Sequence, residues 1–444
     1  MNATPKTLLI LLAYFFILPV EAQIVSERER AQIVDKVLED RFSNLLPALM
    51  DRTGIDMWVL ISREYNEDPV MRTMLPATWL NARRRTILVF YRNRENDTIE
   101  RLAVARYNVG ENITSAWDPE AQPDQWQALL EIIKERNPEQ IGLNFSEDFN
   151  IADGIVKTDY QAFMAMLPEE YSKKVVSAEN LAIGWIETRT EMEMELYREL
   201  VSITKEIIGE AFSNKVITPG KTTSDDVVWW MRQKVTDLGL ETWFHPTIDI
   251  QRKEEGLKDH IDAFSSGYGD KVILPGDLLH CDFGITYLRL NTDCQQHAYV
   301  LKPGESSAPV FLQQALKKGN RLQDILTSNF KTGSSGNEIL AASLKEAKDE
   351  GLQPAIYSHP LGTYGHSSGP TIGMWDSQGG VTGTGDYPLF PRTVYAIELN
   401  TTVNIPEWEK DIRIMLEESG YWGEEGFRYV NGRQTEFLLI SSEP

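Results

Sequence analysis

Two aspartates in the segment from Gly276 to Val300 have a spacing that suits metal binding. Asp282 and Asp293 are eleven positions apart, and apolar and polar residues alternate around both. A period of two on either side of Thr286 to Arg289 predicts two antiparallel strands. If the strands pair so that Asp282 faces Asp293, both carboxylates leave the same face, where they repel unless a cation lies between them. The pattern suggests a metal site, although a solvated strand face is the commoner explanation for two such acids alone.

Further along the chain, two histidines and two glutamates could complete such a site. The chain has only six histidines, and His359 and His366 lie seven positions apart in SHPLGTYGH. The proline and two glycines between them favour a loop or the entry to a strand over a helix. Glu398 in VYAIELN and Glu436 in QTEFLLI lie in apolar, strand-like segments. A glutamate inside a buried strand is costly unless it is paired or binds a metal.

In this order the residues resemble the metallopeptidases of the pita-bread fold, which include Xaa-Pro aminopeptidases, prolidases and methionine aminopeptidases, with creatinase as a non-metal relative. The family pattern is Asp, Asp eleven later, His, Glu and Glu, with a second His seven after the first, and this chain has every member. The resemblance implies that Asp282 chelates one metal, that His359 and Glu398 bind a second, and that Asp293 and Glu436 bridge the two.

The resemblance and the donor set also imply the cofactor and the reaction. Four carboxylates balance two divalent cations, and oxygen donors with one imidazole favour manganese, with cobalt or zinc as alternatives. The family hydrolyses peptides through a metal-bound hydroxide, with a histidine assisting proton transfer. His366 corresponds to that histidine. His260 resembles a further substrate-contacting histidine of the family, and an ordinary surface histidine is an equal alternative.

The other histidines have less specific interpretations. His245 in WFHP is expected to be structural. His280 and His297 share a strand face with the two aspartates, so they either support the ligands from outside or pack within the core.

Three departures from the family leave the preferred peptide open. The family usually has an arginine shortly after the second aspartate, where this chain has Cys294 and two glutamines. Proline-specific members often have an arginine two positions before the last glutamate, whereas this chain has Gln434 at that position and Arg433 one position earlier. Ser367 replaces the acid that often follows the second histidine.

The only two cysteines flank the aspartates. The register that pairs Asp282 with Asp293 also pairs Cys281 with Cys294 on the opposite face of the sheet. Either a cross-strand disulfide or two buried thiols would fit that arrangement.

The order of predicted elements divides the chain into three parts. Residues 1–22 have a lysine, an apolar run and a small-residue end, which is typical of a cleaved secretory signal. Residues 23–185 alternate helix and strand patterns, which indicates an α/β domain, similar to the creatinase-type N-terminal domain of the proline-specific members. Residues 186–444 are expected to form the α+β pita-bread catalytic domain. Its first long helix, Thr190 to Phe212, is predicted to begin with a capping box formed by Thr188 and Glu191.

The net charge and the predicted leader indicate which partners are disfavoured and where the protein is expected to act. The formal net charge of −22 disfavours nucleic acid and anionic membranes as partners. The leader predicts a secreted or periplasmic protein that is not held in a membrane after cleavage. A role for the N-terminal domain in forming a homodimer, or in limiting access to the site, is left open.

These observations predict a secreted, dinuclear metal-dependent aminopeptidase that hydrolyses the N-terminal Xaa-Pro bond of peptides. An apolar pocket for the proline ring is expected from Tyr364, Trp375 and Tyr395, although core packing would equally explain these aromatic residues. A dipeptidase restricted to Xaa-Pro dipeptides is the nearest alternative. A non-catalytic peptide- or protein-binding module of the same fold is a third, disfavoured because such modules usually lose ligands.

Overall fold

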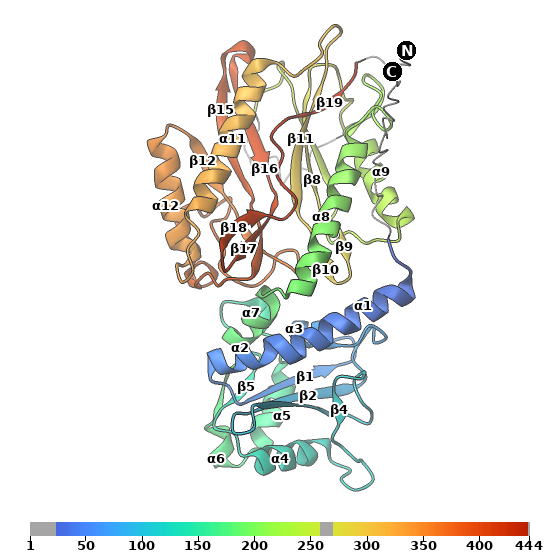
Figure 1. Cartoon of the computed structure of the whole chain (residues 1–444), viewed down its shortest axis with the longest axis vertical. Helices are drawn as coiled ribbons and strands as arrows, with labels where there is room; N and C mark the ends of the chain where they lie inside the picture. Colours follow the sequence, from blue (N-terminus) through green and yellow to red (C-terminus); the bar gives the residue numbers. More distant parts are fainter. Residues whose placement is uncertain (1–23, 258–269, 443–444) are drawn as a thin grey trace, which may run out of the picture.

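The structure, a computed structural model, describes residues 24–257 and 270–442. The predicted leader and His260 lie outside this part of the chain. Figure 1 shows two domains, one above the other, with the long helix α8 (Glu191–Ala211) beginning where they meet. None of the helices within the described residues is long and apolar enough to cross a membrane.

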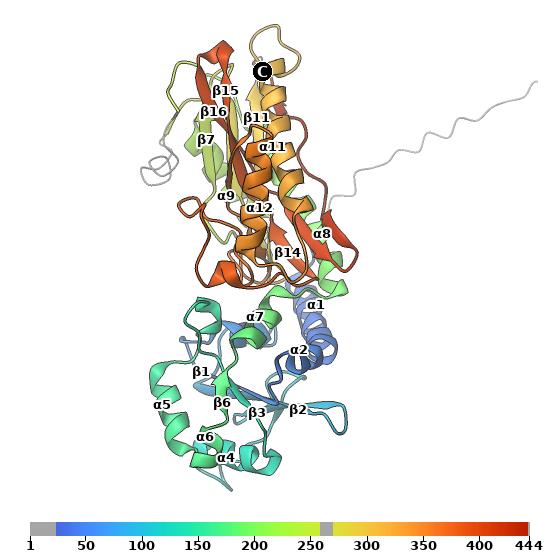
Figure 2. The same cartoon turned by 90° about the vertical axis from the view of Figure 1, so that its left-hand side faces the viewer.

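The N-terminal domain contains a mixed six-stranded sheet between two sets of helices (Figures 1 and 2). The strand order is β4-β3-β2-β1-β5-β6; β1 pairs antiparallel with β2 and parallel with β5. One face packs against α4 and α5, and the other against α1, α2, α3 and α7. The elements are α1 (Glu27–Asp40), the π turn η1 (Arg41–Leu45), α2 (Leu46–Thr53), β1 (Met57–Arg63), α3 (Pro69–Met74), β2 (Arg85–Asn93), β3 (Thr98–Val104), β4 (Thr114–Ser115), α4 (Gln125–Arg136), β5 (Ile141–Leu143), η2 (Asn150–Ala152), α5 (Lys157–Met166), α6 (Glu169–Ser172), β6 (Val175–Ser177) and α7 (Glu179–Glu187).

The second domain places its sheets between two pairs of helices, with α8 and α9 on one side and α11 and α12 on the other (Figure 1). The larger sheets have the orders β19-β11-β8-β7, β12-β15-β16 and β13-β14-β17-β18. The elements after α8 are α9 (Ser224–Asp237), β7 (Thr247–Gln251), β8 (Leu278–Phe283), β9 (Thr286–Tyr287), β10 (Leu290–Asn291), β11 (Cys294–Val300), α11 (Val310–Ser328), α12 (Gly336–Asp349), β12 (Gln353–Ile356), β13 (His359–Leu361), η3 (Thr384–Asp386), β14 (Thr393–Ala396), β15 (Leu399–Ile405), η4 (Pro406–Trp408), β16 (Lys410–Leu416), β17 (Ser419–Gly423), β18 (Gly426–Tyr429) and β19 (Leu438–Ile440).

The junction between the domains is built from α7 and the start of α8. The apolar residues of α7 pack in the N-terminal core, whereas those of α8 pack in the second domain. The capping box of α8 is formed by Thr190 and Glu193, so its prediction at Thr188 and Glu191 is wrong by two residues. The Glu193 carboxylate accepts from the Thr190 N–H at 2.8 Å, as the N3 residue of a capping box does. The same carboxylate binds Arg41 across the junction at 2.7 Å.

The predicted antiparallel pair is β8 and β11, but its register differs by two residues from the prediction. Asp282 lies opposite Gln295 and not opposite Asp293. The extra residues form the short hairpin of β9 and β10 and the turns on either side of it. A shift by an even number leaves every side chain on its predicted face, so the consequence for the site is small.

One predicted strand is divided in the structure. The segment from Val394 to Asn400 was expected to be continuous, but β14 ends at Ala396 and β15 begins at Leu399 in another sheet. The break falls at Ile397 and Glu398. A residue between two strands of different sheets belongs to neither sheet, so the side chain of Glu398 can point into the space between the sheets.

Candidate metal centre

Five side chains from separate strands converge between the sheets of the second domain. Ligand atoms of Asp282, Asp293 and Glu417 lie within 4.8 Å of one another, and so do those of His359, Glu398 and Glu417. Asp282 is in β8, Asp293 immediately precedes β11, and His359 begins β13. Glu398 lies between β14 and β15, and Glu417 lies between β16 and β17. The sheets therefore position an acidic cluster with one imidazole.

Buried polar atoms of this cluster lack partners among the described residues. The Nε2 atom of His359 lies 3.8 Å from Asp293 Oδ2, 3.8 Å from Glu398 Oε2 and 3.7 Å from Glu417 Oε1, beyond hydrogen-bonding distance. His359 Nε2, Asp282 Oδ1, Asp293 Oδ1 and Glu417 Oε1 have no hydrogen-bond partner in this part of the chain. Polar atoms that are buried and aimed at one space without partners are what a metal ion would satisfy.

The protonation preferences of the cluster point the same way. Burial, followed by repulsion from neighbouring carboxylates, raises the pKa values of Asp293, Glu398 and Glu417 well above their ordinary values. Burial raises the pKa of Asp282 to about 7. These acids are unstable as anions without a cation, and divalent metals would supply the missing charge.

His359 is prepared as a neutral ligand. Its Nδ1 atom lies 3.1 Å from the carbonyl oxygen of Pro360, which places the ring proton on Nδ1 and the lone pair of Nε2 toward the acids. Burial lowers its pKa to about 4. A neutral imidazole with its other nitrogen hydrogen-bonded is the usual form of a metal-binding histidine.

The prediction of Glu436 as a bridging ligand is wrong, and Glu417 occupies that place in the cluster. Glu436 is exposed and lines a different hollow, beside Lys317 and Phe437. Of the segment QTEFLLI, which was expected to be strand-like, only the part from Leu438 forms β19, so Glu436 precedes the sheet. Glu417 is 1% exposed. The sequence contains a signal for it, since Glu417 and Glu418 interrupt two apolar strands.

An outer layer of hydrogen bonds supports the acids. Gln295 Nε2 donates to Glu398 Oε1 at 2.7 Å and to Glu417 Oε2 at 3.1 Å. The side-chain oxygen of Gln295 then faces His280 Nε2 at 3.0 Å. His280 therefore takes the supporting role that was one of its two predicted alternatives, acting through Gln295.

The remaining histidines have different roles. His297 Nδ1 lies 3.0 Å from the Leu279 carbonyl oxygen, and its Nε2 accepts from the Met415 N–H at 3.0 Å, so it joins three strands within the core. Burial lowers its pKa to about 4. His245 packs against Trp229, with its Nδ1 3.0 Å from Arg232 Nη1, and is structural as predicted.

A cavity of about 330 Å³ opens onto the acidic cluster. Its other lining residues are mostly apolar and aromatic: Trp243, Phe244, Tyr357, Trp375 and Met415, with Thr247 and His366. Trp375 was predicted to line the pocket. Tyr364 and Tyr395 were wrongly included: the Tyr364 hydroxyl donates to the Pro69 carbonyl of the N-terminal domain, and Tyr395 is fully buried in a core.

His366 lies at the boundary between this cavity and the cluster. Its ring is 4.7 Å from that of His359 and nearly perpendicular to it, at 89°. Its nitrogen, a nitrogen of His359 and an oxygen of Asp293 lie within 4.8 Å of one another. His366 is exposed to solvent, yet the desolvation of its ring among the cavity walls, followed by the neighbouring His359, lowers its pKa. The ring is therefore neutral near pH 7.

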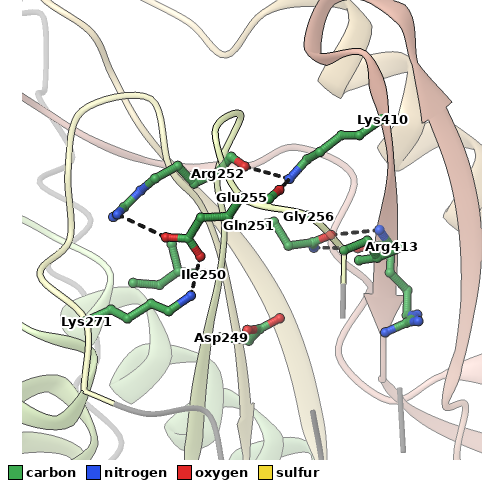
Figure 3. Close-up of a pocket in the computed structure, with 10 residues that line it drawn as sticks. Asp249, Ile250, Gln251, Arg252, Glu255, Gly256, Lys271, Lys410 and Arg413 are labelled. Carbon is green, nitrogen blue, oxygen red and sulfur yellow. Dashed lines mark hydrogen bonds and ion pairs between the residues drawn. The ribbon is translucent and has the colours of Figure 1, made fainter. Parts of the chain in front are cut away.

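A second, smaller cavity of about 50 Å³ lies along the same strands, lined by Asp249 and Gln251 of β7 and Arg413 of β16 (Figure 3). Hydrogen bonds and ion pairs link several of its charged groups to the surrounding chain. The Lys410 ammonium donates to the carbonyl oxygens of Arg252 and Glu255, both at 2.6 Å. The Glu255 carboxylate in turn binds Lys271 and Arg252. Basic side chains outnumber acidic ones in this lining by four to two, in contrast with the acidic cluster.

The two cysteines are buried free thiols, which decides between the two predicted arrangements. In the observed register Cys281 lies opposite Gln296, and Cys294 lies opposite Phe283. The two-residue shift therefore separates the pair that a cross-strand disulfide would have required to face each other.

Comparison with known proteins places the chain in a family. The model of metallopeptidase family M24 matches residues 195–422, which is more than half of the chain, and the protein belongs to that family. No curated protein matches the sequence significantly. The family and the fold together support a metallo-exopeptidase.

Solved structures share the fold over nearly their whole length. The X-Pro aminopeptidase from Thermotoga maritima is 15% identical, with a TM-score of 0.60 over 88% of this chain and 99% of that one. A dipeptidase from Mycobacterium ulcerans is 15% identical, with a TM-score of 0.57 over 93% and 99%. The prolidase from Pyrococcus horikoshii is 14% identical, with a TM-score of 0.54 over 91% and 99%. The predicted fold class, an α/β creatinase-like domain followed by a pita-bread domain, is confirmed.

Proposed function

We propose that the protein is a secreted aminopeptidase that uses two divalent metal ions to remove the N-terminal residue of peptides before proline. One observation carries the catalytic part of the proposal. Four carboxylates and an imidazole converge with buried, unpartnered atoms on the floor of a cavity of about 330 Å³. That donor set fits two hard or borderline divalent ions, and manganese is favoured.

The spatial groups suggest which residues would hold each ion. Asp282, Asp293 and Glu417 form one group, and His359, Glu398 and Glu417 form another. Glu417 belongs to both, and Asp293 also lies in a group with His359. Glu417 and Asp293 would therefore be the residues able to hold both ions. When bound, such metals polarise a carbonyl and lower the pKa of water to near neutrality.

The protein's own residues would perform the remaining steps. Gln295 holds the carboxylates of Glu398 and Glu417 in fixed orientations. Neutral His366 has one N–H donor and one lone pair, so its lone pair could take up the proton that the attacking water loses, and the resulting imidazolium could give a proton to the departing nitrogen. The aromatic walls limit access of bulk water to the cleaved bond.

Two features support cleavage before proline by an aminopeptidase. The wall of Trp243, Phe244, Tyr357 and Trp375 offers an apolar surface to a ring that lacks an N–H. No lysine or arginine occurs among the described residues that line the cavity, so the free carboxylate of a bound dipeptide would find no cation there. Longer peptides would carry that carboxylate away from the cavity.

A dipeptidase is the second candidate. The fold neighbours include proteins described as prolidases, dipeptidases and an X-Pro aminopeptidase, at similar TM-scores. A non-catalytic binding module is disfavoured, because this chain retains a complete set of five possible ligands.

Hydrolysis of matched peptides tests the proposal. Mature protein is treated with chelator and reconstituted with manganese, and its rates are compared on Xaa-Pro dipeptides, Xaa-Pro-Yaa tripeptides and Xaa-Ala-Yaa controls. We expect metal-dependent cleavage of the tripeptides before proline and its loss in Asp293→Asn. Cleavage confined to dipeptides would identify a dipeptidase, and stoichiometric metal binding without any turnover would refute both hydrolase assignments.

Secretion is tested separately, because it depends on the sequence of residues 1–22 alone. We expect the exported protein to begin at Gln23 when its N-terminus is sequenced. An intact Met1 on a protein retained inside the cell would overturn that part of the proposal without affecting the chemistry.

A further inference from the structure

Trp243 occupies an unusual position between the metal centre and His366. It lies in the connection between α9 and β7, and its indole N–H donates to the carbonyl oxygen of Thr292 at 2.8 Å. Thr292 immediately precedes Asp293. The same indole meets the ring of His366 edge to face, with centroids 5.2 Å apart and an interplanar angle of 79°.

Two glycines make room for this tryptophan. A β-carbon on Gly365 would lie 2.5 Å from three carbons of the indole, and one on Gly284 would lie 2.4 Å from the indole nitrogen. Real β-carbons do not approach this closely, so Gly365 excludes larger residues while the indole stays in place. At Gly284 a β-carbon would also lie 2.2 Å from the backbone oxygen of Thr292, so this position excludes a side chain for that reason as well. Gly365 precedes His366, and Gly284 follows Phe283 at the end of β8. The chain segments that carry the site therefore close around Trp243.

Ring packing is what orients His366. Within residues 24–257 and 270–442, no group hydrogen-bonds its imidazole. Its ring contacts are Trp243, His359 at 4.7 Å and Tyr357 at 5.9 Å. Side chains without hydrogen bonds or close packing rotate among rotamers, and a proton-transfer group must hold one orientation to be effective.

We propose that Trp243 is a positioning residue that holds His366 in its working orientation through the edge-to-face contact. The proposal rests on the function proposed above for His366. It also assigns the indole hydrogen bond a definite purpose: tying the ring to the backbone beside Asp293 fixes His366 relative to the ligands. The aromatic ring, more than the N–H group, is then the feature that catalysis needs.

Activity measurements test the contact through a double-mutant cycle. We expect Trp243→Leu to lower kcat by about 10- to 100-fold, beyond any change in KM that follows from the altered cavity wall, and Trp243→Phe, which keeps an aromatic edge, to restore most of kcat. In a His366→Ala background, Trp243→Leu should have almost no further effect on kcat. An equal loss in both backgrounds would show that Trp243 does not act through His366.

Gly365→Ala gives a second route that leaves Trp243 in the chain. Its new methyl group would displace the indole, so we expect the same selective loss of kcat. Gly209→Ala in α8 is the matched control, because a β-carbon there meets nothing within 4 Å. Normal kcat in Gly365→Ala, with the fold intact by circular dichroism, would count against the proposal.

Carbethoxylation of histidines in the metal-free protein separates this inference from the proposed function. A second pair, Trp229 and His245, has ring centroids 5.4 Å apart at 61° and lies outside the cavity lining. We expect Trp243→Leu to speed modification of His366 several-fold but not that of His245, and Trp229→Leu to do the reverse. Unchanged modification of His366 would overturn the inference, whereas a wild-type protein without peptidase activity would overturn only the function.

Discussion

Two clusters of buried acidic side chains differ in what balances their charge. At the domain junction, Glu193 is held between Arg41 at 2.7 Å and Arg189 at 2.9 Å, and all three side chains are at most 5% exposed. At the metal centre, Asp293 and Glu417 are similarly buried, at 5% and 1% side-chain exposure, and have no arginine or lysine beside them among the described residues. Acids that are equally buried therefore have basic partners at the junction and lack them at the metal centre.

The pKa directions express this contrast. Burial alone would raise the pKa of Glu193, but Arg189 and Arg41 outweigh it and the pKa falls below its ordinary value. At the metal centre, repulsion adds to burial and the pKa of Glu417 rises well above its ordinary value. An acid buried with its own cation stabilises the fold, whereas one buried without a cation creates an affinity for metal. The neighbouring Glu418 has Lys205 at 2.8 Å, but burial outweighs that lysine and the pKa of Glu418 is still raised.

The largest effect should come from neutralising one acid of the metal centre. We expect Glu417→Gln to lower kcat/KM by about a thousandfold or more, because it removes a charge and points an amide N–H₂ group at the amide of Gln295. Metal content per chain should fall in the same variant, measured by elemental analysis after dialysis against manganese.

Glu436→Gln is the matched control for that measurement, since it is the same change at an exposed glutamate outside the cluster. Its kcat/KM should stay within about twofold of the wild type. The reverse result, with loss at position 436 and tolerance at position 417, would contradict the assignment of Glu417.

Four of the five cluster residues could be predicted from the sequence, and the fifth shows where that reasoning fails. Asp282, Asp293, His359 and Glu398 follow a recognisable order of types and spacings. Glu436 was predicted to be buried because apolar residues surround it in the sequence. In the structure, however, its segment joins the sheet only from Leu438 onward. Which acid is buried depends on where separate sheets meet, and local patterns do not contain that information.

The fold was predicted more completely than the strand pairing. The alternation of helix and strand patterns in the N-terminal domain and the long helix after residue 186 follow from apolar periodicity. The register of β8 and β11 was wrong because the small hairpin of β9 and β10 absorbs residues in a way that no turn motif indicates. Leu288 and Arg289 form that turn without glycine, and their φ angles are positive, at 51° and 64°.

The second prediction compares the stability of the two clusters in metal-free protein. Glu193→Gln leaves two buried arginines without a full counter-charge, so it should destabilise the fold by about 3 kcal/mol. Asp293→Asn relieves repulsion and should stabilise the metal-free protein by about 1 kcal/mol while abolishing activity. Urea unfolding in chelator measures both.

Manganese provides the control for this comparison. At a thousandfold excess over its dissociation constant, one bound ion should stabilise the wild type by about 4 kcal/mol. It should stabilise Glu193→Gln by a similar amount and Asp293→Asn by much less. Destabilisation by Asp293→Asn in chelator would mean that some compensating charge already balances the metal centre.

The smallest effect concerns Glu187 at the end of α7, which is intermediate between the two clusters. Its buried carboxylate accepts from the Tyr387 hydroxyl at 3.2 Å and lies 3.8 Å from the half-buried Arg52. Burial raises its pKa to about 8, against the opposing effects of Arg52, Tyr387 and Arg189.

Because the folded pKa of Glu187 exceeds its unfolded value near 4.5, its contribution to stability is complete below pH 4.5 and is lost as the pH rises through about 8. We expect wild-type protein to lose stability relative to Glu187→Gln as the pH rises from 5 to 9, measured by urea unfolding at each pH with chelator present. The difference between the two proteins removes the titration of all other groups, including the metal centre. A difference that stays constant across this range would show that Arg52 fully compensates Glu187, which would place it with Glu193 and not between the two clusters.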